Sequence, residues 1–228
     1  MNETENRFYE EPFMNKLFYQ PVNLRKVILA TVLIFLGLFG LLYGPTYLGI
    51  FSVALTSYLA FILVFGVPLT NHLFSKPIRP IKISLIYFPL NWVVSLAAGF
   101  ILTYLLGWQL QGNLVTDHPS LLLIFTLPIM LLGEELFSLF FLSIFSSRFS
   151  LTVSSILSAI IFGLIHFSTY YNGNSFETLV HICLIQGSAR LIFNQAAIKS
   201  NSLWTSWMVH VLFDFSSIVI SILPQLFN

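Results

Sequence analysis

The sequence contains very little charge. Only 8% of its 228 residues are Asp, Glu, Lys or Arg, whereas a soluble domain carries about 25%. Hydrophobic residues make up 57% of the chain, and the mean hydropathy is +0.86. This composition excludes an ordinary soluble domain and indicates an integral membrane protein whose main solvent is the lipid bilayer. The net charge of +1 identifies no partner, and no nucleic acid is expected.

Cysteine is almost absent as well. Cys183 is the single cysteine, so no intrachain disulfide can form, and its apolar surroundings favour a buried, inert thiol. The polar N-terminal stretch lacks the short basic region and cleavage site of a signal peptide. We therefore expect the first apolar stretch to be retained as a membrane span.

Long apolar runs make up most of the sequence. A spanning helix needs about 20 mostly apolar residues, and breaks rich in Gly, Pro, Asn and Ser separate the runs. The sequence predicts an all-α, polytopic transmembrane helix bundle, with a cytoplasmic N-terminal segment at 1–26 and a helical membrane domain at 27–222. The seven predicted spans are 27–43, 47–69, 83–107, 121–146, 151–167, 178–198 and 203–222.

The basic residues predict the orientation. Lys and Arg concentrate in cytoplasmic loops. Outside the spans they lie before the first span and in the second, fourth and sixth loops, at Arg7, Lys16, Arg25, Lys26, Lys76, Arg79, Lys82, Arg148 and Lys199. All of them share one side if the N-terminus is cytoplasmic and the C-terminus is not. Arg190 is the exception, because it lies within a span.

Ionisable side chains within the spans are the candidate site. Such residues are costly in lipid and usually face a protein interior or a wet cavity. Helical rise places His210 about 12 Å, Glu134 and Asp214 about 18 Å, and His166 about 22 Å from the cytoplasmic helix ends. Residues from three spans therefore share a slab about 10 Å thick. His210 and Asp214 share a helix face, whereas Glu135 points about 100° away from Glu134 and can serve a different partner.

These residue types suit hydrolysis. A carboxylate takes a proton from water, and an imidazole positions that water or ligates a metal. A second imidazole, aided by Asp214, can stabilise an oxyanion. Two other interpretations stay open: a proton or cation relay in a transporter, and separate structural roles for His166 and for the His210–Asp214 pair. His181 is interpreted as packing or polar contact within its span.

Three short motifs carry a family resemblance. Glu134-Glu135 begins the first, Phe162 to His166 matches FxxxH, and His210 to Asp214 matches HxxxD. In order and spacing they resemble the CAAX-protease and bacteriocin-processing family, also called CPBP or Abi, whose first motif is EExxxR. The chain lacks HExxH, has only one aspartate within a span and has no convincing serine nucleophile motif, so other intramembrane protease classes fit less well.

One motif position departs from the family. Leu139 stands where the family has an arginine. Arg190 is the buried cation expected to face Glu135 and offset its charge. The alternative is that Arg190 extends its side chain towards the cytoplasm without a glutamate partner.

The resemblance implies an intramembrane endopeptidase of a bacterial cell membrane. In it Glu134 activates water, His166 helps to hold it, His210 and Asp214 form the oxyanion side, and Glu135, Arg190 and Phe162 support them. The substrate would be a membrane-embedded or lipidated peptide of the prenyl or leader-peptide type. No cofactor is certain; a divalent metal such as zinc on Glu134, His166 and His210 is left open. The rival interpretation is a non-catalytic bacteriocin-immunity or scaffold protein that binds a partner membrane protein, which the change to Leu139 favours.

Overall fold

The computed structural model describes residues 17–112 and 122–226, with side chains as far as Ser221. Most of the predicted N-terminal segment 1–26 lies outside these residues, and so do two of its basic residues, Arg7 and Lys16. Within the described ranges every regular element is a helix. The elements are α2 (Leu24–Tyr43), α3 (Thr46–Phe65), α4 (Val67–His72), α5 (Pro80–Phe100), η1 (Ile101–Leu105), α7 (Leu123–Ser146), α8 (Leu151–Ile165), α9 (Ser175–Ile182), η2 (Cys183–Gly187), α10 (Ser188–Ser200) and α11 (Leu203–Leu226).

The chain is a multi-pass integral membrane protein built as a helical bundle, as the composition predicts. Six helices in the described ranges are long and apolar enough to cross a membrane, and Leu151–Ile165 is a shorter apolar helix. At 1.5 Å per residue, α8 is about 22 Å long, less than the roughly 30 Å of the hydrocarbon core. The predicted count of seven spans and the predicted orientation therefore stay predictions.

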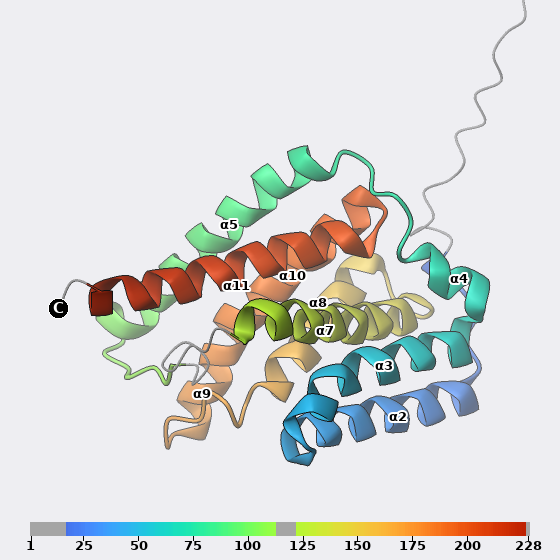
Figure 1. The fold of residues 1–228 in the computed structure, drawn as a ribbon, viewed down its shortest axis with the longest axis horizontal. Helices are drawn as coiled ribbons and strands as arrows, with labels where there is room; N and C mark the ends of the chain where they lie inside the picture. The colour runs from blue at the N-terminus through green and yellow to red at the C-terminus, as the bar shows by residue number, and fades with distance from the viewer. Residues whose placement is uncertain (1–16, 113–121, 227–228) are drawn as a thin grey trace, which may run out of the picture.

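A tight hairpin of α2 and α3 forms one edge of the bundle (Figure 1). The Asn23 side chain caps the start of α2, and Gly44-Pro45 separates the two helices. Small residues let them approach closely, and Ser52 Oγ donates a hydrogen bond to the Gly37 carbonyl across the interface. On its other face, α3 packs against α7.

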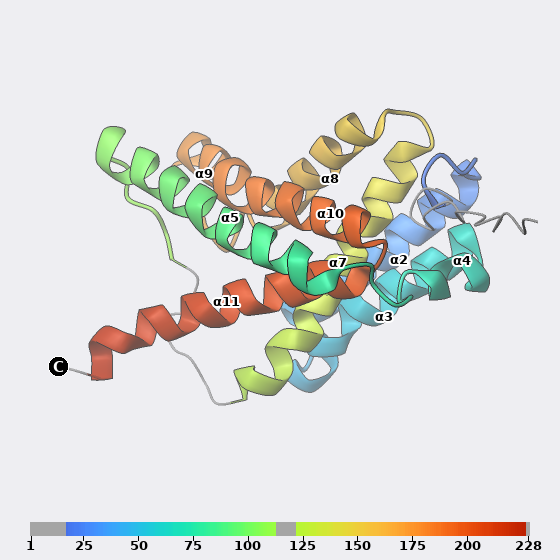
Figure 2. The ribbon, with the colours of Figure 1, turned by 90° about the horizontal axis from the view of Figure 1, so that it is seen from above.

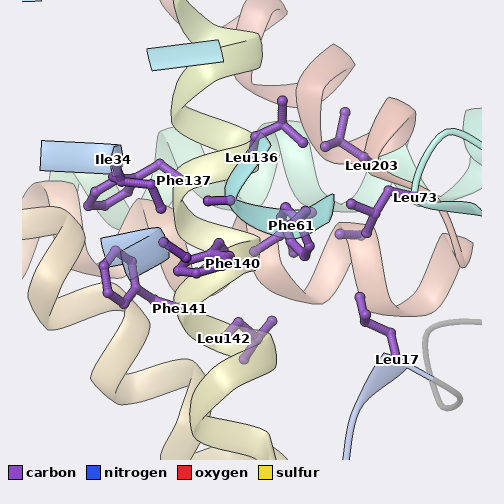
Figure 3. Packing of buried hydrophobic residues seen from close by; sticks show 14 of the residues in the cluster. Leu17, Ile34, Phe61, Leu73, Leu136, Phe137, Phe140, Phe141, Leu142 and Leu203 are labelled. Carbon is purple, nitrogen blue, oxygen red and sulfur yellow. The ribbon is translucent and has the colours of Figure 1, made fainter. Parts of the chain in front are cut away.

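The main core joins this hairpin to α7. Phe61 of α3 meets Phe140 of α7 edge to face, with ring centroids 5.4 Å apart. Leu73 and Leu203 extend the same cluster to the loop after α4 and to the start of α11 (Figure 3). The core therefore holds α7, which carries both glutamates, at the centre of the bundle.

A second layer of α5, α10 and α11 lies on the other side of α7 (Figure 2). At one end, the loop between α4 and α5 is hydrogen-bonded to the turn between α10 and α11: Ile78 N donates to Ser200 O, and Leu203 N donates to Leu73 O. Lys76 and Lys199 thus lie at the same end of the bundle, which is the arrangement that the predicted orientation requires.

Two local breaks and one burial prediction differ from the sequence analysis. Gly66, with φ of +81°, ends α3 inside the predicted span 47–69, and a π-helical turn, η2, interrupts the predicted span 178–198. Cys183 is exposed, so the prediction of a buried thiol was wrong. An apolar stretch in a membrane protein can face lipid as readily as the protein interior, so apolar neighbours in sequence do not require burial.

Candidate active site

Neighbouring glutamates on α7 meet different surroundings. Successive helical residues point about 100° apart, and the Glu135 side chain is fully buried whereas that of Glu134 is 23% exposed. The expected divergence of the two side chains is therefore present. One acid faces the protein interior and the other faces open space.

Glu135 is held by three hydrogen bonds. Arg190 Nη1 donates to Oε1 at 2.8 Å, and Nη2 donates to Oε2 at 3.0 Å. His210 Nδ1 donates to Oε1 at 2.9 Å. Bidentate pairing with a guanidinium is strong and directional, so the carboxylate cannot move without breaking several bonds. Glu135 therefore fixes the position of His210.

Arg190 reaches Glu135 from another helix. Its expected proximity to Glu135 is confirmed by the two hydrogen bonds above, and its guanidinium lies over the rings of Phe162 and Phe193, 5.6 and 5.4 Å from their centroids. Leu139, which stands at the motif position, is fully buried in the apolar core. The cation that pairs with Glu135 thus comes from α10, and α7 has an apolar residue at the motif position.

Two residues that the sequence analysis did not identify continue this network. Arg190 Nε donates to Asn194 Oδ1 at 3.0 Å, and Asn194 Nδ2 donates to Ser155 Oγ at 3.0 Å. Asn194 lies four residues after Arg190, the spacing at which helical side chains meet. This spacing could have identified Asn194 from the sequence, because a buried arginine needs acceptors for its remaining N–H donors.

His210 presents its second nitrogen to two acids. Because Nδ1 donates to Glu135, the free position is Nε2, which lies 3.9 Å from Glu134 Oε2 and 3.9 Å from Asp214 Oδ1. The imidazole stacks on Phe193, with ring centroids 4.3 Å apart. Both gaps exceed a direct hydrogen bond and suit a bridging water.

His166 lies at the end of α8 with a defined orientation. Its Nδ1 is 2.8 Å from the carbonyl oxygen of Phe162. Since a carbonyl only accepts, Nδ1 carries a proton, so in the neutral form of the ring Nε2 is an acceptor. Phe162 thus supports both histidines, because its ring also contacts His210 at 6.4 Å between centroids.

Glu134 lies in the wall shared by two cavities. The larger, of about 450 Å³, is lined mostly by apolar residues of α2, α3 and α7 and includes His166. The smaller, of about 300 Å³, includes Asp214, His181 and Gln186. Glu134 and His166 thus line the larger cavity together, whereas His210 is not among the residues that line either cavity. Glu134 and Met130, one turn apart on α7, line both cavities, because they project between the two spaces.

The donor set does not form a metal site. Among the described residues, no group of three or more His, Cys, Asp or Glu side chains is arranged to hold a metal ion. Glu134, His166 and His210 therefore do not fit the zinc set that the resemblance left open.

A protein-family model matches part of the chain. The model of the family described as type II CAAX prenyl endopeptidase Rce1-like matches residues 116–216. This stretch contains all three motifs, and it agrees with the family that they resemble. No curated protein and no solved structure matches the chain.

Proposed function

We propose that the chain is an intramembrane endopeptidase in which Glu134 activates a water molecule. One observation carries the proposal: Glu134 lines both cavities, and its Oε2 lies 3.9 Å from His210 Nε2. A carboxylate that faces open space beside an oriented imidazole has the geometry of a general base. The match to a CAAX-type protease family supports the same chemistry.

The water would lie between Glu134 and the histidines. A separation of 3.9 Å between Glu134 and His210 suits one bridging water. Glu134 takes a proton from this water while the water oxygen attacks the peptide carbonyl carbon. His166, whose Nε2 is an acceptor, helps to orient the water before attack. When the tetrahedral intermediate collapses, Glu134 passes the proton to the leaving amine.

His210 and Asp214 would form the oxyanion side. Because Nδ1 donates to Glu135, Nε2 donates only in the doubly protonated imidazolium, and in that form it stabilises the charge that develops on the carbonyl oxygen while the ring is fixed in place. Glu135 supplies that fixation through its hydrogen bond to Nδ1. Arg190 in turn holds Glu135. In this proposal Glu135, Arg190 and Phe162 are positioning residues, and they do not touch the substrate.

The substrate would be membrane-associated. Hydrolysis at this depth requires a substrate that enters from lipid or from its surface. The larger cavity is lined by Phe35, Phe39, Ile50 and other apolar side chains. It suits an apolar side chain or a lipid group, and the family description supports peptides of the CAAX prenyl type. We propose a prenylated or leader-peptide-type substrate.

The test is cleavage of a synthetic peptide panel by purified protein in proteoliposomes. The panel holds prenylated CAAX-type peptides, leader-type peptides and unmodified apolar peptides, and products are identified by mass spectrometry. We expect the wild type to cleave at least one class and Glu134→Gln to cleave none, because Gln keeps the shape but cannot act as a base. Glu177→Gln, at a surface acid that bonds Asn172 and Asn174, is the control and should retain activity.

The rival function is a non-catalytic immunity or scaffold protein. The replacement of the motif arginine by Leu139 favoured this rival function. Arg190 supplies a cation to Glu135, so the replacement is weaker support for the rival. Under the rival, Glu134→Gln would keep full biological activity in cells. That result, together with absence of cleavage by the wild type, would overturn the enzyme proposal.

A further inference from the structure

The two cavities that meet at Glu134 differ in chemistry. We call the larger one the apolar cavity and the smaller one the polar cavity. Half of the residues lining the polar cavity are polar, namely Glu134, Tyr170, His181, Gln186, Asp214 and Ser217. The apolar cavity is walled chiefly by aliphatic and aromatic side chains of the α2–α3 hairpin and α7. A chain that crosses Glu134 would therefore meet an apolar and a polar environment on opposite sides of the reacting bond.

The π-helical turn η2 places two polar groups in the polar cavity. His181 lies just before η2 and Gln186 lies within it, five residues later. In a π-helix, residues five apart lie on the same face, and such turns often occur at functional sites. Both side chains line the cavity. An uninterrupted α-helix would rotate Gln186 away from His181 by about 140°.

This turn is fixed by close backbone packing. A Cβ at Gly163 of α8 would lie 3.1 Å from the Ile182 carbonyl oxygen, at the start of η2. A Cβ at Gly187 would lie 3.6 Å from the Ala159 carbonyl oxygen. Glycines at both positions thus allow α8 and η2 to touch. The positions of His181 and Gln186 are set by the scaffold and do not depend on a loop.

Gln186 and His181 carry unused hydrogen-bonding capacity. Neither side chain makes a hydrogen bond with another residue in the described part of the chain, although His181 is only 5% exposed and its ring lies 5.0 Å from that of Tyr170. Gln186 is half-buried where it lines the cavity, so its amide is open to a ligand. A peptide strand in the membrane has the complementary need, because each unsatisfied backbone group there costs several kcal/mol.

We propose that Gln186 and His181 hydrogen-bond to the extended backbone of the substrate on one side of the scissile bond. The primary amide of Gln186 offers both a donor and an acceptor, which is what a backbone amide requires. The apolar cavity takes the opposite flank. The inference rests on the proposed function and adds a specificity: the enzyme selects substrates that unwind beside the scissile bond, with a hydrogen-bonding strand on one flank and an apolar group on the other.

The test pairs a change in the enzyme with a change in the substrate. The best-cleaved peptide of the panel is compared with analogues in which one backbone amide next to the scissile bond is replaced by an ester, which removes the N–H donor. When the ester lies on one particular flank of the scissile bond, we expect the kcat/KM of the wild type to fall roughly fivefold, which corresponds to the loss of about one hydrogen bond. An ester on the other flank should have no such effect. The Gln186→Leu protein should cleave the all-amide peptide and that ester analogue with equal kcat/KM. The change should come mainly from a raised KM for the all-amide peptide.

Two controls separate this role from a structural one. Ile185→Leu, at a neighbouring apolar residue of the same cavity, should keep the amide-over-ester preference. Gln186→Asn, which keeps a shorter primary amide, should restore part of that preference. Equal losses for amide and ester peptides in Gln186→Leu would overturn the proposal, because they would indicate a general packing defect.

A binding experiment decides the matter independently of cleavage. Photoreactive versions of each panel peptide, with the label placed in turn at each central position, are irradiated with the Glu134→Gln protein. We expect the label on η2 or on α11 near Ser217. Labelling confined to other segments would overturn the inference even where wild-type cleavage is intact. Labelling of η2 without any wild-type cleavage would instead keep the peptide site and reject the enzyme proposal.

Discussion

Glu135 shows how a buried charge is maintained inside a membrane protein. Its two oxygens accept three hydrogen bonds, and two of the donors belong to one guanidinium. Removing one partner of a buried ion pair is costly because the remaining charge stays desolvated. The same geometry explains how the chain tolerates Leu139: the charge requirement belongs to the site, so the cation can come from another helix.

A charge relocation tests this explanation. Arg190→Leu should lower stability by about 3–5 kcal/mol and abolish cleavage. Leu139→Arg in the same chain should restore part of both, since residue 139 lies four residues after Glu135 and can reach it on the same helix face. Thermal denaturation in detergent and the peptide assay measure the two effects. Leu139→Arg alone should be destabilised by the second buried cation, and a silent Arg190→Leu would contradict the explanation.

A second residue-scale prediction concerns Asp214. Its side chain is 31% exposed and lies 3.9 Å from His210 Nε2. Asp214→Asn should stay close to wild-type activity, because an amide can donate to the oxyanion and the resembled family uses either residue. Asp214→Leu removes every polar side-chain atom that faces His210 Nε2 and should cost about 100-fold in kcat, the size of effect that loss of one oxyanion-stabilising contact has. If Asn and Leu were equally inactive, the carboxylate itself would be required.

At the scale of elements, the spans could be read from the sequence, whereas their interruptions could not. The bilayer dictates the length and apolarity of a crossing helix, so α2, α7 and α11 match their predicted ranges closely. The π-turn η2 has no such signature, because Cys183 to Gly187 continues the apolar pattern on both sides. The pairing of Arg190 with Glu135 was predictable because buried charges need partners. Ser155 was not, because it joins the network only through tertiary packing.

The contact between α3 and α7 gives an element-scale prediction. A Cβ at Gly133, next to Glu134, would lie 2.9 Å from the Ala54 backbone nitrogen. Gly133→Ala should therefore push α3 away, cost about 1–3 kcal/mol of stability as overpacking does, and lower cleavage by moving Glu134. Gly99→Ala is the matched control, since a Cβ there meets nothing within 4 Å. It should be neutral or more stable, by up to about 1 kcal/mol, and equal melting temperatures would contradict the prediction.

At the scale of the whole molecule, the site depends on parts of the chain that lie far apart. The apolar cavity needs α2 and α3, and the polar cavity needs η2 and α11. Among the helices that the structure describes, α7 is the one that lines both cavities. The sequence could place the motif residues at similar depth, but it could not place the two cavities on either side of Glu134, because that depends on how the hairpin and the α5–α10–α11 layer pack around α7. The predicted boundary between the N-terminal segment 1–26 and the membrane domain 27–222 stays a prediction.

The last prediction concerns the orientation of the bundle. The basic residues place the N-terminus in the cytoplasm, and seven crossings would place the C-terminus on the opposite side. The outcome depends on α8, whose 15 residues reach only about 22 Å. Single cysteines at Asn2 and Asn228, introduced after Cys183→Ser removes the exposed native thiol, can be labelled in intact cells with a membrane-impermeant reagent. We expect labelling at 228 and protection at 2, with both sites labelled after lysis. Equal protection or equal labelling of the two ends in intact cells would mean that the chain crosses an even number of times and that α8 enters the membrane without spanning it.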